Sequence, residues 1–187
     1  MRVLGAWLRT VLRPTASAAP GGPQALRFKL QSPDIKADST VPMAHVYRGM
    51  GCNGENQSPA LEWVNPPTGT RGFAVTCYDP DAPTGSGWWH WQIFDIPQTE
   101  KGLARGAGNP EGRRPAGAVQ SRNDYGEVGY GGPCPPPGDK PHRYVFTVYA
   151  LKVGKLDTPQ NASCALVGFM LNANKIEEAS FTATFGR

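Results

Sequence analysis

The chain has 187 residues, of which 39% are hydrophobic, so its size and composition suit one packed domain with or without a tail. Its longest apolar runs, at 3–8 and 165–171, are far shorter than the roughly 18 to 20 residues that span a bilayer, which excludes an integral membrane protein. Glycine (23 residues) and proline (19 residues) are abundant, and because both break helices and favour turns, they argue against a helix bundle.

The formal net charge of +4 is unevenly placed along the chain. Five Lys or Arg residues precede the first acid, Asp34, and the remainder of the sequence is nearly neutral. That remainder contains no Lys/Arg stripe, RNP-like run or zinc-finger spacing. We therefore expect no nucleic-acid partner.

Residues 1–25 differ in character from the rest of the chain. Wound as a helix, they gather apolar side chains on one face and Arg2, Arg9 and Arg13 on the other. Such an acid-free amphipathic segment is typical of an organellar presequence or a membrane-surface helix, and the A-x-A triplet at 16–18 also fits a secretory cleavage site. An unstructured extension or a mis-assigned start codon is an equally open interpretation.

The second half of this segment, at 14–23, is a linker rich in proline and glycine. We therefore expect an N-terminal extension with its linker over 1–25 and one folded domain over 26–187. The expected location is cytoplasmic. An organellar or exported location is the alternative if residues 1–25 are a targeting segment.

Short segments rich in β-branched and aromatic residues predict the strands of this domain. They lie at 26–30, 59–63, 71–78, 88–96, 144–153 and 180–185. One helical pattern stands out at 162–178, where apolar residues recur with helical spacing and Asn161 or Ser163 can cap the first turn. The predicted fold class is mainly β, with packed antiparallel or mixed sheets, Greek-key-like connections and one late helix.

The four cysteines, Cys52, Cys77, Cys134 and Cys164, are scattered and form no C-x-x-C pair for zinc or redox chemistry. Two disulfides are conceivable in an exported protein. Since Cys77 lies inside an apolar run, where a buried free thiol is common, we favour reduced structural thiols.

A first polar cluster follows the expected strand at 71–78. Asp79 and Asp81 are held between prolines, which restrict the backbone and aim the two carboxylates in advance. An ordinary Asp-Pro turn is the alternative interpretation.

A second cluster is the run Trp88-Trp89-His90-Trp91. In a regular strand, His90 shares a face with Trp88 and Gln92, while the other two tryptophans face the opposite side. The acidic turn just upstream could supply the carboxylate that fixes the tautomer of His90. The alternative is a satisfied core histidine.

A third cluster begins in the loop at 129–138 and continues into the following strand. His142 and Tyr144 lie on one face of that strand and Arg143 on the other. The glycines of the loop allow backbone N–H groups to approach an anion. Two imidazoles, a phenol and these N–H groups are donors suited to a phosphate oxygen.

These motifs resemble a known family. The segments 79–83, 89–91 and 132–133, together with 142–144, resemble the two signature regions of the phosphatidylethanolamine-binding protein family, also called Raf-kinase-inhibitor-like. Further stretches at 49–51, 54–59 and 167–169 are similar to its bacterial YbhB/YbcL branch, and the resemblance covers about residues 27–187.

The resemblance implies a β-sheet fold with a small anion pocket that accepts phosphate or a phospholipid headgroup. By motif position, the pocket residues would be Asp79, Asp81, His90, Gly132, Pro133, His142 and Tyr144. The Ala82–Pro83 bond is a candidate for a cis peptide. Eukaryotic members also carry a C-terminal helix that closes over the pocket, whereas this sequence stops at Arg187 just after its last expected strand, so we expect no lid-dependent affinity for phosphatidylethanolamine.

The leading functional interpretation is a non-enzymatic binding protein without a cofactor. Its expected ligand is a phosphate-bearing small molecule or phospholipid headgroup. The family name suggests a partner kinase or protease, and a homodimer is open. No G-x-S-x-G, P-loop or G-x-G-x-x-G motif indicates an enzyme. The alternative is a metal-assisted hydrolase with His90, His142 and Asp79 as ligands.

Overall fold

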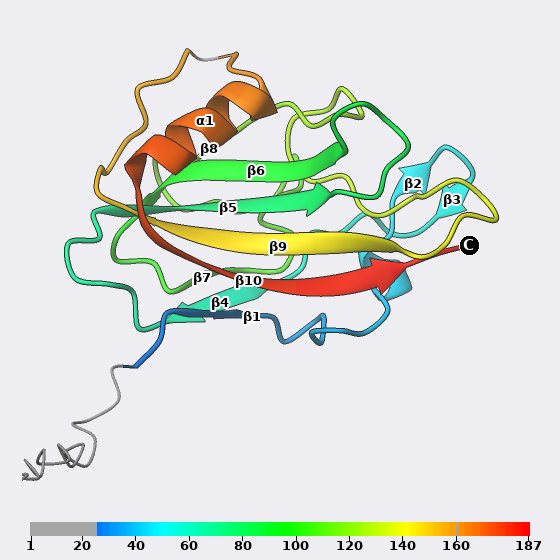
Figure 1. Cartoon of the computed structure of the whole chain (residues 1–187), viewed down its shortest axis with the longest axis horizontal. Helices are drawn as coiled ribbons and strands as arrows, with labels where there is room; N and C mark the ends of the chain where they lie inside the picture. Colours follow the sequence, from blue (N-terminus) through cyan, green and yellow to red (C-terminus); the bar gives the residue numbers. More distant parts are fainter. Residues whose placement is uncertain (1–25, 160) are drawn as a thin grey trace, which may run out of the picture.

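The computed structural model describes residues 26–159 and 161–187 (Figure 1). The interpretations of residues 1–25 fall outside that part of the chain, and the domain division at residue 26 stays a prediction.

The described chain is mainly β, as predicted, and all pairings between its named strands are antiparallel. A five-stranded sheet has the order β10-β9-β5-β6-β8. Its members are β5 (Gly72–Asp79), β6 (Trp88–Pro97), β8 (Val119–Gln120), β9 (His142–Leu151) and β10 (Lys175–Phe185). The smaller sheets are β1-β4-β7 (Lys29–Gln31, Leu61–Val64, Gly102–Leu103) and β2-β3 (Arg48–Gly49, Cys52–Asn53). The remaining elements are a 3-10 turn, η1 (Met43–His45), and one helix, α1 (Cys164–Asn174).

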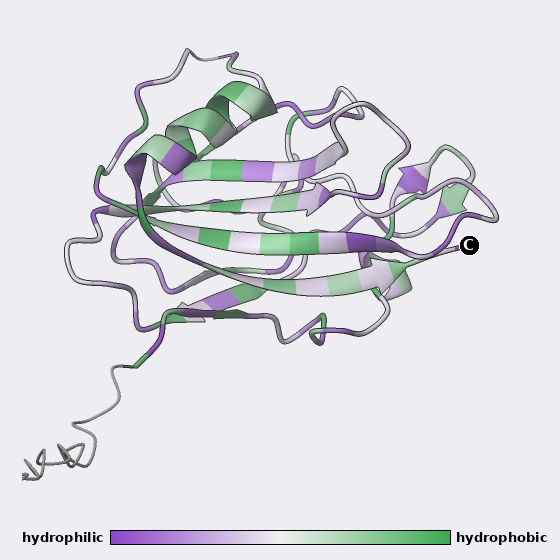
Figure 2. Cartoon of the chain, viewed as in Figure 1, coloured by the Kyte–Doolittle hydropathy of each residue, from purple (hydrophilic) through white to green (hydrophobic). Residues whose placement is uncertain are grey.

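The five-stranded sheet is covered on both faces (Figures 1 and 2). One face packs against the β1-β4-β7 sheet, and this main core contains Trp63, Phe73, Trp91 and Phe146. The other face carries α1, with Val167 among the buried residues of a second cluster. Because both faces are covered, β5 is buried almost throughout and lacks the polar alternation of a strand with one solvated face.

Strand β6 has a bulge at His90 that the sequence did not predict. Trp89 pairs with Tyr78 and Trp91 with Cys77, so His90 has no partner on β5. The expected alternation holds for Trp88, which lines the same cavity as His90, but it is wrong beyond the bulge. Gln92 donates to the carbonyl of Cys164 at the helix, while the ring of His90 lies 5.1 Å from that of Tyr144. The bulge thus separates the side of His90, which faces the cavity described below, from the side of Gln92.

The helix is shorter than predicted. Ser163 caps it, since its side chain accepts from the N–H of Leu166, but it ends at Asn174 and the chain enters β10 directly. Hydrogen bonding to β9 extends β10 back to Lys175, so pairing with a neighbouring strand overrides the local helical pattern. Among the described residues, no helix is long and apolar enough to cross a membrane.

The prediction of four reduced cysteines is wrong for two of them. Cys52 and Cys134, which are 82 residues apart, form a disulfide, whereas Cys77 and Cys164 are free and buried. Only the fold brings β3 next to the loop that contains Cys134, and sequence spacing held no sign of this proximity.

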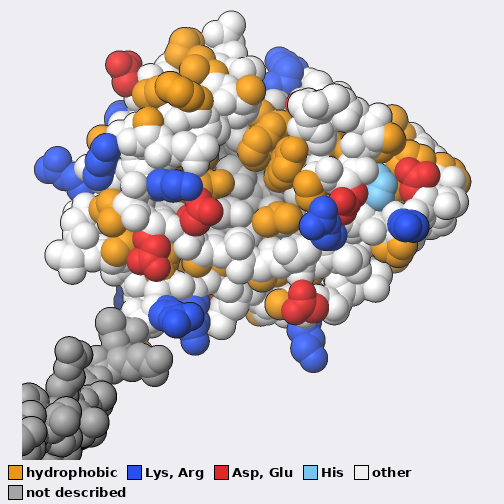
Figure 3. Space-filling view, in the orientation of Figure 1, with side chains coloured by type: hydrophobic (Ala, Val, Ile, Leu, Met, Phe, Trp, Pro, Cys, Tyr) orange, Lys and Arg blue, Asp and Glu red, His pale blue; other side chains and the backbone are white. Residues whose placement is uncertain are grey.

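Acidic and basic side chains are interspersed on the face of the molecule shown in Figure 3. A mixture of this kind produces no extended field of a single sign on that face.

Candidate functional site

A cavity of about 150 Å³ lies beside the ends of β5, β6 and β9. Side chains from these strand ends form its polar part, namely Asp79, Trp88, His90, His142 and Tyr144. Loops supply an apolar rim that includes Pro83 and Pro135. Since a water molecule occupies about 30 Å³ of liquid, this volume suits a group of a few heavy atoms, such as a phosphate.

Three buried side-chain nitrogen or oxygen atoms of the described residues have no hydrogen-bond partner: Trp88 Nε1, His90 Nε2 and the Tyr144 hydroxyl. All three residues line this one cavity. Buried polar groups are nearly always paired, because an unpaired one costs about 1–3 kcal/mol. Their concentration here indicates a site for a polar ligand or ordered water.

The imidazole of His90 is oriented by the backbone. Its Nδ1 lies 2.7 Å from the carbonyl oxygen of Gly131, and because a carbonyl only accepts, Nδ1 carries the hydrogen. Burial lowers the pKa of His90 to about 4, so the ring is neutral near pH 7. The expectation that the acidic turn fixes this tautomer is therefore wrong, since Gly131 performs that role.

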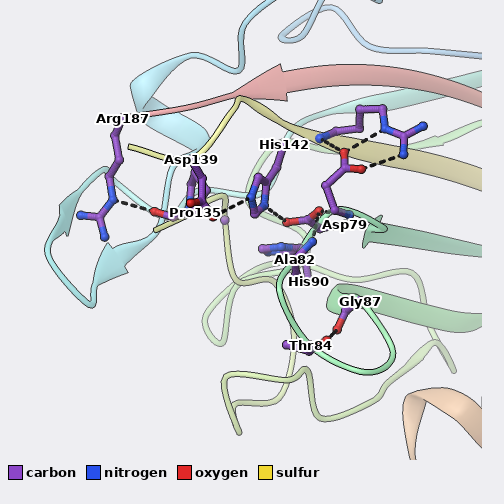
Figure 4. A network of polar contacts seen from close by, with 12 residues as sticks. Asp79, Ala82, Thr84, Gly87, His90, Pro135, Asp139, His142 and Arg187 are labelled. Atoms are coloured by element: carbon purple, nitrogen blue, oxygen red, sulfur yellow. Dashed lines mark hydrogen bonds and ion pairs between the residues drawn. The ribbon is translucent and has the colours of Figure 1, made fainter. Parts of the chain in front are cut away.

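Asp79 instead orients the second histidine. Its Oδ2 lies 2.8 Å from Nδ1 of His142, and its Oδ1 accepts the N–H groups of Asp81 and Ala82 at 2.8 and 3.1 Å. Figure 4 shows His142 between Asp79 and Asp139, whose Oδ2 is 3.5 Å from Nε2 of the histidine. Asp79 is thus a positioning residue that closes the turn and holds the imidazole.

The Ala82–Pro83 bond is trans, like every described peptide bond, so the expected cis peptide is wrong. The turn is closed by the carboxylate of Asp79, through the two N–H groups that it accepts, and the chain reaches the cavity rim without a cis bond.

Asp81 lies outside the cavity. Its carboxylate forms a two-pronged pair with the guanidinium of Arg143, at 2.8 and 2.7 Å, and accepts the N–H of the same residue at 2.9 Å. Arg143 lowers the pKa of Asp81 to about 2. The alternation predicted for the strand is confirmed, with His142 and Tyr144 buried and Arg143 exposed.

Gly132 and Pro133 lie behind the cavity and do not line it. The N–H of Gly132 donates to Asn56 Oδ1, and that of Gly131 donates to the carbonyl of His90, so neither is free for an anion as expected. A Cβ on Gly132 would lie 2.0 Å from the carbonyl oxygen of His45, so glycine is required here for close packing. The glycines therefore place the loop that orients His90.

The sequence does not predict two aromatic residues that line the cavity, nor the contacts that join the loops at its rim. The run that contains Trp88 gives this residue no evident role, and Tyr125, which packs against Trp88 and His90, has no motif that marks it. At the rim, Cys52–Cys134 joins β3 to the proline-rich loop, and Arg187 donates to the carbonyls of Pro135 and Met50 in the same two segments. Both contacts depend on proximity in space alone.

The family model described as phosphatidylethanolamine-binding protein matches residues 31–186. The UPF0098 protein YbcL of Escherichia coli K12 is 53% identical over 87% of this chain and 89% of its own length. The UPF0098 protein YbhB of the same organism is 46% identical over 84% and 99%. A putative lipoprotein of Mycobacterium tuberculosis, LppC, is 34% identical over 80% and 67%.

Solved structures agree with these relationships. The crystal structure of E. coli YbcL, described as a new member of the mammalian PEBP family, matches with a TM-score of 0.83 over 86% of this chain and 98% of that one, at 53% identity. A putative PEBP homologue from Chlamydia trachomatis matches with a TM-score of 0.71 over 86% and 97%, at 27% identity.

Proposed function

The chain belongs to the phosphatidylethanolamine-binding protein family, and from that premise we propose that it is a non-enzymatic binding protein whose cavity holds a phosphoryl-type anion. The observation that supports this most strongly is the convergence of three buried, unpartnered polar atoms on one small cavity. A phosphate group, free or in a headgroup, offers oxygen atoms to several donors at once, and this matches the arrangement.

Two of the three atoms are donors to such an anion. The indole Nε1 of Trp88 can only donate, and burial raises the pKa of Tyr144 so that its hydroxyl keeps its proton. His142 is held by Asp79 and lines the same cavity. Among the described residues, no Lys or Arg lines it, so neutral donors in a buried setting supply the recognition.

The alternative of a metal-assisted hydrolase depends on Asp79 as a ligand beside the two histidines. Both of its oxygens are already engaged, one with His142 and one with the turn. Within the described residues, no three His, Cys, Asp or Glu side chains are grouped so as to hold a metal ion. We therefore favour binding over hydrolysis.

We further propose that the protein is exported rather than cytoplasmic. The Cys52–Cys134 disulfide is typical of oxidising compartments, and one relative is described as a lipoprotein. Protein purified without reductant and alkylated after unfolding should show two free thiols, and four would contradict the proposal. The partner kinase or protease and the homodimer stay predictions.

Calorimetric titration of inorganic phosphate tests the anion site. Tyr144→Phe and Trp88→Phe each remove one donor, so each should weaken phosphate binding by roughly five- to tenfold. Tyr149→Phe is the matched control, because Tyr149 packs against the cluster beneath α1, away from the cavity. Absence of phosphate binding to the unmodified protein, or equal affinity in all four proteins, would overturn the proposal.

A further inference from the structure

The cavity presents an acceptor as well as donors. Since Nδ1 of His90 donates to the carbonyl of Gly131, the unpartnered Nε2 of the neutral ring carries a lone pair. Trp88 Nε1 and the Tyr144 hydroxyl each carry a hydrogen. A ligand that satisfies all three atoms must therefore accept from two groups and donate to the third.

His90 does not readily become a donor by taking up a proton. The ring is completely buried, and this burial is the main reason that its pKa is low. The ionisable side chains that face it from neighbouring elements are Asp79, Asp124, Tyr125, His142 and Tyr144. The two carboxylates favour the imidazolium, but desolvation outweighs them.

Building on the proposed anion site, we infer that the cavity selects phosphoryl ligands that carry a hydrogen on a phosphorus-bound oxygen. These ligands are free phosphate and the monoanions of phosphomonoesters. The P–OH donates to His90 Nε2, while the other oxygens accept from Trp88 and Tyr144. Every buried atom of the site is then paired.

Anions without such a hydrogen fit the same space less well. Sulfate near neutral pH and phosphodiesters offer only acceptors, so one of their oxygens would face the lone pair of His90. That leaves a buried acceptor unpaired, and the expected loss of affinity is roughly ten- to hundredfold. Diester headgroups of lipids belong to this weaker class, whereas monoester metabolites and free phosphate belong to the favoured one.

The test compares two pairs of ligands with matched shapes by calorimetry on the full chain at pH 6. Phosphate should bind at least about tenfold more tightly than sulfate, and methyl phosphate at least about tenfold more tightly than dimethyl phosphate. A phosphomonoester has a second pKa of about 6, so the methyl phosphate preference should fall about tenfold per pH unit above that value. Dimethyl phosphate corrects for titration of the protein.

Two variants separate the acceptor from the donors. Tyr144→Phe should weaken phosphate and sulfate to the same extent and leave their ratio unchanged. His90→Asn offers an amide donor and should bring the ratio of the phosphate and sulfate affinities close to one. Because this variant could fail to fold, the ratio measured on the unmodified protein decides by itself whether the site prefers phosphate. Equal affinities for phosphate and sulfate, or tighter sulfate binding, overturn the inference but leave the anion site intact, whereas binding of neither overturns both.

Discussion

Asp79 and Asp81 stand two residues apart in one turn, yet they belong to two different polar centres. Asp79 is 3% exposed and holds His142 on the cavity side of β9, while Asp81 pairs with Arg143 on the outer side. Their partners are neighbours on the strand, and successive strand residues face opposite ways. The same type of side chain, an aspartate, therefore holds a cavity residue at one position and pairs with a surface residue at the other. The burial of each position determines which of these roles it has.

The comparison implies very different energetic roles for the two carboxylates. Asp79→Ala leaves the buried Nδ1–H of His142 and two part-buried backbone N–H groups without partners, so it should lower the free energy of unfolding by roughly 3–5 kcal/mol. Urea unfolding at pH 7 measures this loss. Asp79→Asn keeps an acceptor for the turn and should fall between Asp79→Ala and the unmodified protein. A loss below about 1 kcal/mol for Asp79→Ala would remove the distinction between the two centres.

A pH series sharpens the contrast on the buried side. The pKa of His90 is about 4 when folded, against about 6.5 for an unperturbed histidine, so the unfolded chain binds more protons between these values. The stabilisation is complete above pH 6.5 and is lost as pH falls toward 4, by about 3 kcal/mol. Unfolding of the unmodified protein and of His90→Asn at pH 7, 5.5 and 4 isolates this contribution. Parallel slopes for the two proteins would mean that His90 titrates normally.

The smallest effect is expected at the exposed pair. Asp81→Asn should change the stability at pH 7 by a small fraction of the Asp79→Ala effect, because water and salt screen the contact with Arg143. The pKa of Asp81 is about 2 when folded and about 3.9 when unfolded, so its contribution is present above pH 4 and is lost as pH falls toward 2. Unfolding in low and high salt at pH 7 and pH 3 tests both points. A salt-independent loss as large as that of Asp79→Ala would contradict the comparison.

Local patterns predicted the long strands well. The segments expected at 71–78 and 88–96 correspond to β5 at Gly72–Asp79 and β6 at Trp88–Pro97, since their aromatic and β-branched composition is a local signal. The first residues of β10 carry no such signal. Lys175, Glu177 and Glu178 are charged and exposed, and pairing with β9 makes this segment a strand.

The sequence predicted several of the residues that line the candidate site, but it predicted only part of their arrangement in space. His90, His142, Tyr144 and Asp79 do line one cavity, whereas Asp81, Gly132 and Pro133 lie outside it. The bulge at His90 also places Gln92 on the helix side instead of beside His90, and this bulge depends on the register with β5.

The sequence by itself determined the chemistry that this protein can assemble: two histidines, a tyrosine and a pair of acids near strand ends, with His142 and Tyr144 on one face. Those features follow from residue types and from the two-residue repeat of a strand, which are local properties. Only the tertiary structure decided which nitrogen of each imidazole carries a hydrogen. His90 meets Gly131 41 positions away, and His142 meets Asp79 63 positions away. A hydrogen bond depends on tenths of an ångström between such distant segments, and that precision comes from the packing of the whole fold.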